Sequence, residues 1–112
     1  VGSNFAAANL RQSIWQGAQL AQCQFDGANL YQSYFEKAKA LDCSFRDTDL
    51  TYADFSHAQL AHCSFDGAKM QRAVLHATQE ENISMPQRNQ TLGTDKVRLK
   101  AERWGQATVK PV

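Results

Sequence analysis

Large apolar residues recur at every fifth position along most of this chain. Fourteen of fifteen consecutive positions fit, and Ala40 is the single weak member. A small residue precedes each of them by two positions, and the residues between are mostly polar. The large residues are Phe5, Leu10, Trp15, Leu20, Phe25, Leu30, Phe35, Phe45, Leu50, Phe55, Leu60, Phe65, Met70 and Leu75.

A period of five fits neither an α-helix, which repeats every 3.6 residues, nor a flat strand, which repeats every two. It requires a backbone that turns a corner after each short extended segment and directs two side chains inward per repeat. Four such sides close a coil of about twenty residues, and coils stack like parallel strands about 4.8 Å apart. Residues 1–77 are therefore predicted to form an all-β solenoid, a four-sided β-helix of just under four coils.

Residues twenty apart should lie above one another in ladders on the four sides of this column. Phenylalanine and cysteine each segregate to single ladders, which supports four sides per coil independently of the five-residue count. The predicted core ladders are Phe5, Phe25, Phe45 and Phe65; Cys23, Cys43 and Cys63; Leu10, Leu30 and Leu50; and Trp15, Phe35 and Phe55.

The three cysteines are interpreted mainly as packing residues. They occupy the small inward position beside phenylalanine and point the same way from stacked coils, whereas tetrahedral zinc needs converging ligands. Neighbouring coils bring Cα atoms into disulfide range, but parallel Cβ vectors would strain the bridge. Packing is favoured over a disulfide or a metal, and no metal or cofactor is expected.

Several segments match a known repeat signature. Ala28-Asn29-Leu30, Ala53-Asp54-Phe55 and Cys63-Ser64-Phe65-Asp66-Gly67 resemble the A(D/N)LXX motif of the pentapeptide-repeat family, and the resemblance covers residues 3–77. It implies that the four-sided β-helix is right-handed. Members of this family include cytoplasmic proteins of undefined role and repeat segments attached to secreted effectors or secretion-associated adaptors.

The pattern stops after residue 77, because Glu80 stands where a leucine is due. Residues 78–112 are expected to form a loop or short strand followed by one α-helix, which begins near Thr94 and Asp95 and ends at Trp104. Val97, Ala101 and Trp104 would lie on one face of this helix, although the alternation of Val97, Leu99 and Ala101 also allows a strand. A solenoid leaves exposed core at its ends. The preferred role of this segment is therefore to cap the last coil, with Trp104 as the apolar plug, and the alternative is a contact with a second copy.

Charge and composition weaken several functional classes. The net charge is +1, and no apolar run approaches the roughly 20 residues that span a bilayer, so neither nucleic acid nor a membrane is an expected partner. The column carries six basic and seven acidic residues. Such a short and nearly neutral rod imitates duplex DNA poorly. A DNA-mimic protein that acts on a type II topoisomerase, which the quinolone-resistance members of the family resemble, is therefore only the alternative function.

No catalytic site is expected. His57, His62 and His76 fall at outward positions and are interpreted as solvated surface residues. His62 should stack over Asp42, one coil below, as a surface histidine–carboxylate pair, but Asp42, Ser44 and His62 lack a cleft in which to converge. The chain is therefore predicted not to be an enzyme.

One outward patch has the composition of a protein-binding surface. Its predicted members are Ile14, Tyr31, Tyr34 and Tyr52, with Val74 further along the same side and Arg11 and Arg72 nearby. Scattered apolar surface, or cover by the chain's own tail, would explain the same residues. The sequence thus favours a non-catalytic interaction or scaffolding module with an unidentified protein partner or a second copy. It is expected in the bacterial cytoplasm, or as a domain of a larger secretion-associated or effector protein.

Overall fold

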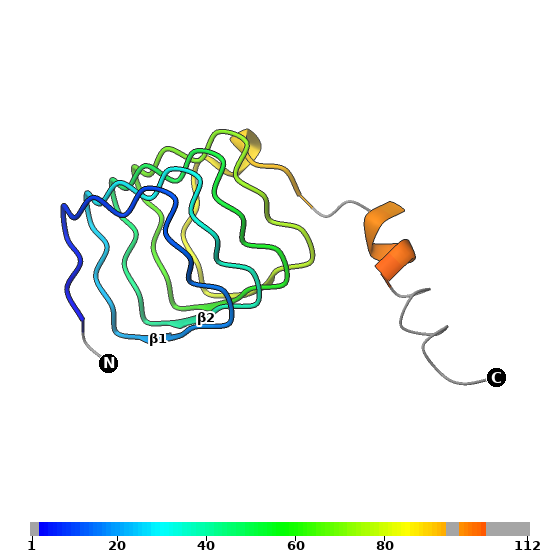
Figure 1. The fold of residues 1–112 in the computed structure, drawn as a ribbon, viewed down its shortest axis with the longest axis horizontal. Coiled ribbons are helices and arrows are strands. Elements are labelled where there is room, and N and C mark those ends of the chain that lie inside the picture. The colour runs from blue at the N-terminus through cyan, green and yellow to red at the C-terminus, as the bar shows by residue number, and fades with distance from the viewer. Residues whose placement is uncertain (1–2, 94–96, 103–112) are drawn as a thin grey trace.

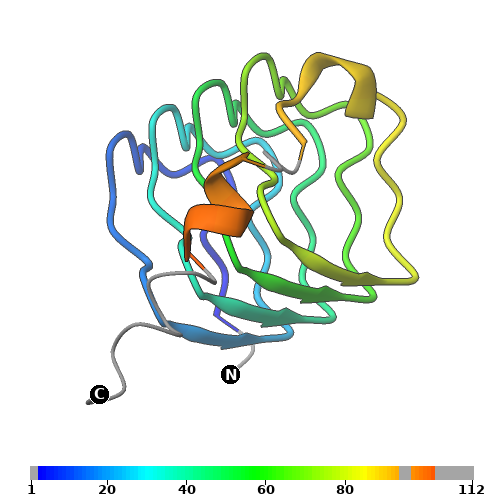
Figure 2. The ribbon, with the colours of Figure 1, turned by 90° about the vertical axis from the view of Figure 1, so that its right-hand side faces the viewer.

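The computed structural model describes residues 3–93 and 97–102. From Ser3 to Leu92 the backbone winds as a four-sided coil whose turns stack into one column (Figures 1 and 2). One side is a four-stranded parallel sheet in the order β1-β2-β3-β4. Its strands are β1 (Gln19–Ala21), β2 (Lys39–Leu41), β3 (Gln59–Ala61) and β4 (Gln79–Glu81). Each residue pairs with the residue twenty positions away in the neighbouring strand. The predicted four-sided β-helix is confirmed.

The other three sides are held by single parallel bridges with the same spacing. These bridges join Asn4, Gln24, Ser44, Ser64 and Ser84 on the first side; Asn9, Asn29, Asp49 and Lys69 on the second; and Ile14, Tyr34, Asp54 and Val74 on the third. The third side comprises residues 13–17, 33–37, 53–57 and 73–77. Backbone hydrogen bonds between coils thus satisfy the donors and acceptors of segments too short to be full strands.

Every corner from Ala7 to Asn82 contains a residue with positive φ. Only Gly17, Gly27 and Gly67 are glycines, with φ between 69° and 73°; thirteen corners use other residues, with φ between 51° and 61°. A backbone hydrogen bond such as Ala8 N to Phe5 O closes most of these turns at about 3 Å. The coil therefore imposes a left-handed corner conformation that these residues would seldom adopt alone.

Two aromatic ladders fill the column. Consecutive rings of the phenylalanine ladder stack 4.9–5.1 Å apart, and Phe35 stacks on Phe55 at 4.7 Å. The two ladders meet edge to face, as between Phe45 and Phe55 at 6.2 Å. Such offset and edge contacts add to the free energy gained by burying the rings. Phe5, Leu10 and Trp15 are only partly buried, because no described residue covers them from above.

The coil path continues past residue 77, where the repeat pattern ends. Strand β4 pairs with β3 although Glu80 replaces the usual apolar residue. Its carboxylate binds Arg88, from the 3₁₀ turn η1 (Arg88–Gln90), and accepts a hydrogen bond from Thr78 Oγ1. Met85 supplies the next buried apolar side chain. Backbone pairing, which needs no particular side chain, carries the coil beyond the predicted boundary to the bridge between Val74 and Leu92.

Residues 97–102 form the described part of the predicted C-terminal helix. They lie against a side of the column rather than over its end (Figure 2). Val97 is 80% exposed and Ala101 is also exposed, whereas Leu99 is half-buried. The polar side chains of Arg98 and Glu102 contact the column. The proposed plug Trp104 lies outside the described residues. Within the described ranges, no helix has the length and apolar character needed to cross a membrane.

Candidate functional site on the third side

The third side of the column divides into two halves of opposite character. Its first two coils present Ile14 and Tyr34, which are neighbours in adjacent coils and are 73% and 45% exposed. Its last two coils present Ser56 and His76, both fully buried. We call these the open half and the covered half.

The other members of the predicted patch lie at the corner beside the open half. The rings of Tyr31 and Tyr52 meet edge to face 5.7 Å apart, and Tyr52 is exposed. The guanidinium of Arg11 lies 4.7 Å from the centre of the Tyr31 ring, within the range of a cation–π contact. The structure thus places Ile14 beside Tyr34 on the third side and Tyr31 beside Tyr52 at the adjoining corner, where Arg11, Tyr31 and Tyr52 are ordered by mutual contacts.

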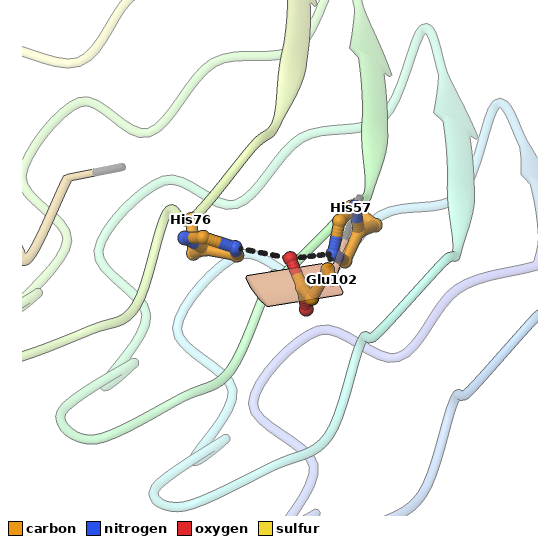
Figure 3. A group of neighbouring side chains, drawn as sticks. All are labelled: His57, His76 and Glu102. Carbon is orange, nitrogen blue, oxygen red and sulfur yellow. Dashed lines mark hydrogen bonds and ion pairs between the residues drawn. The ribbon is translucent and has the colours of Figure 1, made fainter. Parts of the chain in front are cut away.

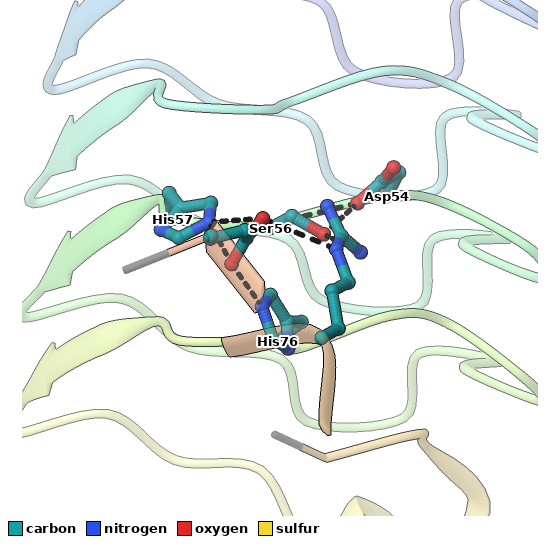
Figure 4. A network of polar contacts seen from close by, with 6 residues as sticks. Asp54, Ser56, His57 and His76 are labelled. Carbon is teal, nitrogen blue, oxygen red and sulfur yellow. Dashed lines mark hydrogen bonds and ion pairs between the residues drawn. The ribbon is translucent and has the colours of Figure 1, made fainter. Parts of the chain in front are cut away.

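A network of polar contacts begins at Asp54 on the covered half (Figure 4). Asp54 Oδ1 accepts hydrogen bonds from the backbone N–H and the hydroxyl of Ser56 at 2.9 and 2.6 Å. Arg98 in turn donates from Nη1 to Ser56 Oγ at 3.3 Å. The C-terminal segment, residues 97–102, therefore contacts the column through the hydroxyl of Ser56.

Glu102 joins the same segment to two histidines (Figure 3). His76 Nε2 lies 2.8 Å from Glu102 Oε1, and His57 Nε2 lies 3.2 Å from both carboxylate oxygens. These hydrogen bonds, from His76 foremost and then His57, lower the pKa of Glu102 to about 2. Because an ionised carboxylate only accepts hydrogen bonds, Nε2 of both imidazoles carries the proton in this arrangement.

The expectation that all three histidines are solvated is wrong for His76, which the C-terminal segment covers. The periodicity could not reveal this contact, because Glu102 lies outside the repeat. His57 and His76 are nineteen residues apart, so a strict search at spacing twenty also misses them. An offset of one residue between adjacent coils is the signal that would have found the pair.

The expected pairing of His62 with Asp42 does not form among the described side chains. Both residues instead line a shallow, open depression on the first side, with a volume of about 700 Å³. Ser44 lines it too, but its hydroxyl donates to Asp26. The depression therefore contains no serine–histidine hydrogen bond that would activate a nucleophile.

The cysteine ladder lies inside the column. Cys23, Cys43 and Cys63 are free and 2% exposed. Cys43 and Cys63 approach backbone carbonyls of the fourth side at 3.4–3.5 Å. The neighbouring Cys63 thiol and burial raise the pKa of Cys43. Its thiol is thus a protonated core group, and the ladder shows no convergence of three sulfur atoms on one point.

Comparison with known proteins connects this geometry to a family. A family model described as a pentapeptide repeat region matches residues 18–94, and no curated protein matches the chain. A solved pentapeptide repeat protein from the thylakoid lumen of Arabidopsis thaliana is similar, with 25% identity and a TM-score of 0.70 over 73% of this chain and 57% of that one.

Two cyanobacterial structures match with lower TM-scores. One is HetL, a pentapeptide repeat protein involved in heterocyst differentiation regulation in Nostoc, with 21% identity and a TM-score of 0.39 over 83% of this chain and 43% of that one. The other is a pentapeptide repeat protein from Cyanothece, with 19% identity and a TM-score of 0.35 over 84% and 89%. The chain therefore spans less than two thirds of the length of the first two relatives. Its repeat, its right-handed quadrilateral β-helix and the family match agree, and the chain belongs to the pentapeptide-repeat family.

Proposed function

We propose that this protein is a non-catalytic interaction module that binds a protein partner through the open half of its third side and the adjoining corner. The observation that carries this proposal is that Ile14, Tyr34 and Tyr52 are exposed on the third side and its corner, where Tyr52 also contacts the half-buried Tyr31 that Arg11 covers. Tyrosine and arginine are the residue types that most often dominate the binding energy of protein interfaces.

The rigidity of the column supports this role. Each patch residue stands on a coil that is hydrogen-bonded to its neighbours, as in the bond from Tyr34 N to Ser13 O at 2.9 Å. Contacts among Arg11, Tyr31 and Tyr52 hold their side chains in place before any partner arrives. Binding to a preordered surface sacrifices little side-chain entropy, so more of the contact energy appears as affinity.

Charge favours a protein partner over a role as a DNA mimic. Imitating duplex DNA requires a dense row of negative charge. A basic residue, Arg11, contacts the patch at Tyr31, and the column as a whole is almost neutral, with seven acidic and six basic residues in residues 1–77.

The test is affinity capture from the source cells with three forms of the full chain. These are the wild type, a Tyr34→Ala/Tyr52→Ala variant and a Leu41→Ala control. Leu41 is a fair control because it is 47% exposed, like Tyr34 and Tyr52 at 45% and 46%, but lies on the sheet of the fourth side.

We expect a protein that the wild type and the control capture equally and that the double variant loses. With that protein purified, its Kd should rise at least about tenfold in the double variant, equivalent to about 1.4 kcal/mol. Light scattering identifies the case in which the partner is a second copy. Unchanged capture and affinity in the double variant would refute the proposed surface.

A further inference from the structure

Three metal-binding side chains converge at the covered half of the third side. Among the described residues, the ligand atoms of His57, His76 and Glu102 all lie within 4.8 Å of one another. They come from three separate parts of the chain: the third coil, the fourth coil and the C-terminal helical residues 97–102. Figure 3 shows the two imidazoles on either side of the carboxylate.

The separations are close to those of a metal site. Zinc–ligand bonds of about 2.0–2.1 Å in a tetrahedron place ligand atoms about 3.3 Å apart. The imidazole-to-carboxylate distances here are 2.8 and 3.2 Å. The two imidazole nitrogens lie within 4.8 Å of each other, and binding an ion would bring them to this tetrahedral separation. Two histidines and one carboxylate form a common zinc ligand set, and imidazole selects zinc, copper, nickel or iron over calcium and magnesium.

From this convergence we propose that His57 Nε2, His76 Nε2 and a carboxylate oxygen of Glu102 bind one divalent transition-metal ion, with Zn²⁺ as the best fit. The ion fastens the C-terminal helical residues 97–102 to the side of the column. Each imidazole then moves its proton to Nδ1, because the Nε2 lone pair coordinates the ion.

The surroundings already orient these ligands. His76 is held rigidly, since it is 1% exposed and its ring packs edge to face against His57 at 5.3 Å. Arg98 Nε donates to Glu102 Oε2 at 3.3 Å, whereas Oε1 is the oxygen that contacts both histidines. Outer contacts of this kind commonly fix the ligands of a metal site. The Arg98 charge opposes a cation, so we expect moderate rather than very tight affinity.

The rest of the chain offers little competition for such an ion. It contains three histidines and three cysteines in total. The three thiols are buried in the column, and His62 lies on the first side, away from the other two histidines. A single equivalent of bound metal is therefore expected, and His62→Ala is a matched control for His57→Ala.

The full chain should be titrated with Zn²⁺ by calorimetry and with Co²⁺ by visible absorption, with Ca²⁺ as a negative control. We expect one equivalent of Zn²⁺ and a Co²⁺ spectrum of a low-coordinate nitrogen–oxygen site. Affinity should fall at least tenfold in His57→Ala and Glu102→Gln and stay unchanged in His62→Ala. His57 and Glu102 are both partly exposed, so these variants should fold even if a change at His76 does not.

Hydrogen exchange supplies a second readout. Zn²⁺ should slow amide exchange in residues 97–102 of the wild type but not of Glu102→Gln. The proposal is overturned if no stoichiometric Zn²⁺ binds. It is equally overturned if binding survives both His57→Ala and Glu102→Gln, or if bound Zn²⁺ leaves exchange of the C-terminal segment unchanged.

Discussion

The two halves of the third side share one backbone geometry and one core, yet their surfaces differ. Tyr34 in the open half and Asp54 in the covered half are partners in the same ladder of bridges. The side chain at this position is a solvent-facing ring in one coil and, one coil further, a carboxylate that fixes Ser56. The coil therefore sets where side chains stand, and the residues at outward positions decide whether a surface remains open or receives the chain's own C-terminal segment.

The largest effect should come from the core beneath both halves. Phe35 lies under the open half and Phe55 under the covered half, and the exposed fraction of each residue is 1% or less. Replacing either with alanine should lower the free energy of unfolding by about 3–5 kcal/mol, from lost burial and the cavity left behind. Urea denaturation of the two variants checks this. A markedly smaller loss for one of them would show that the column is not packed equally under both halves.

The thiol ladder tests whether the column opens as one unit. Cys43 should react with a thiol reagent more than about a hundredfold slower in the folded protein than in urea, because reaction requires opening of a stable core. Its raised pKa keeps it protonated as the pH passes about 8.5, where an ordinary thiol ionises. The folded protein holds this proton more tightly than the unfolded chain does. The stability gained in this way is fully present below that pH and is lost as the pH rises above it.

Reaction rates at pH 7 and pH 9 provide the measurement. We expect the folded protein to stay protected at both values. Rapid labelling of Cys43 at pH 9 without unfolding would show that the coils separate locally.

A smaller effect is expected from cutting the C-terminal contact. Glu102→Ala removes the acceptor shared by His57 and His76, so amide exchange in residues 97–102 should become faster while exchange in β2 and β3 stays unchanged. Glu81→Ala, at an exposed acidic residue on β4, is the control and should alter neither. Slower or unchanged exchange in residues 97–102 of the Glu102 variant would show that this contact does not hold the segment.

The smallest effect on stability belongs to the open half. Tyr34→Ala should change the free energy of unfolding by no more than about 0.5 kcal/mol, as is usual for exposed positions. Thermal unfolding beside Phe35→Ala makes the contrast, since the two residues are neighbours in sequence. A loss as large as that of Phe35→Ala would mean that Tyr34 supports the fold rather than a partner.

The sequence was informative where the structure repeats and uninformative where it does not. The spacing of five predicts the four sides, and the spacing of twenty predicts the ladders of Phe45 and Cys43, because identical backbone units must stack in register. The boundary at residue 77 differs from the structure because backbone pairing tolerates Glu80, whose charge is compensated by Arg88.

The covered half could not be predicted for a related reason. Glu102 reaches His57 and His76 from outside the repeat, so no internal periodicity relates its position to theirs. The predicted apolar helix face also did not indicate how residues 97–102 lie on the column, since Val97 on that face is 80% exposed. Polar contacts made by Arg98 and Glu102 determine where the described turn lies.

The most direct test of the two-halves account compares amide and side-chain NMR shifts of the full chain with those of a chain ending at residue 93. The account predicts that removing the C-terminal segment shifts His57, His76 and Ser56 and leaves Ile14 and Tyr34 unchanged. Shifts of similar size at Ile14 and Tyr34 would contradict it, because they would show that the chain's own tail, and not a partner, occupies the open half.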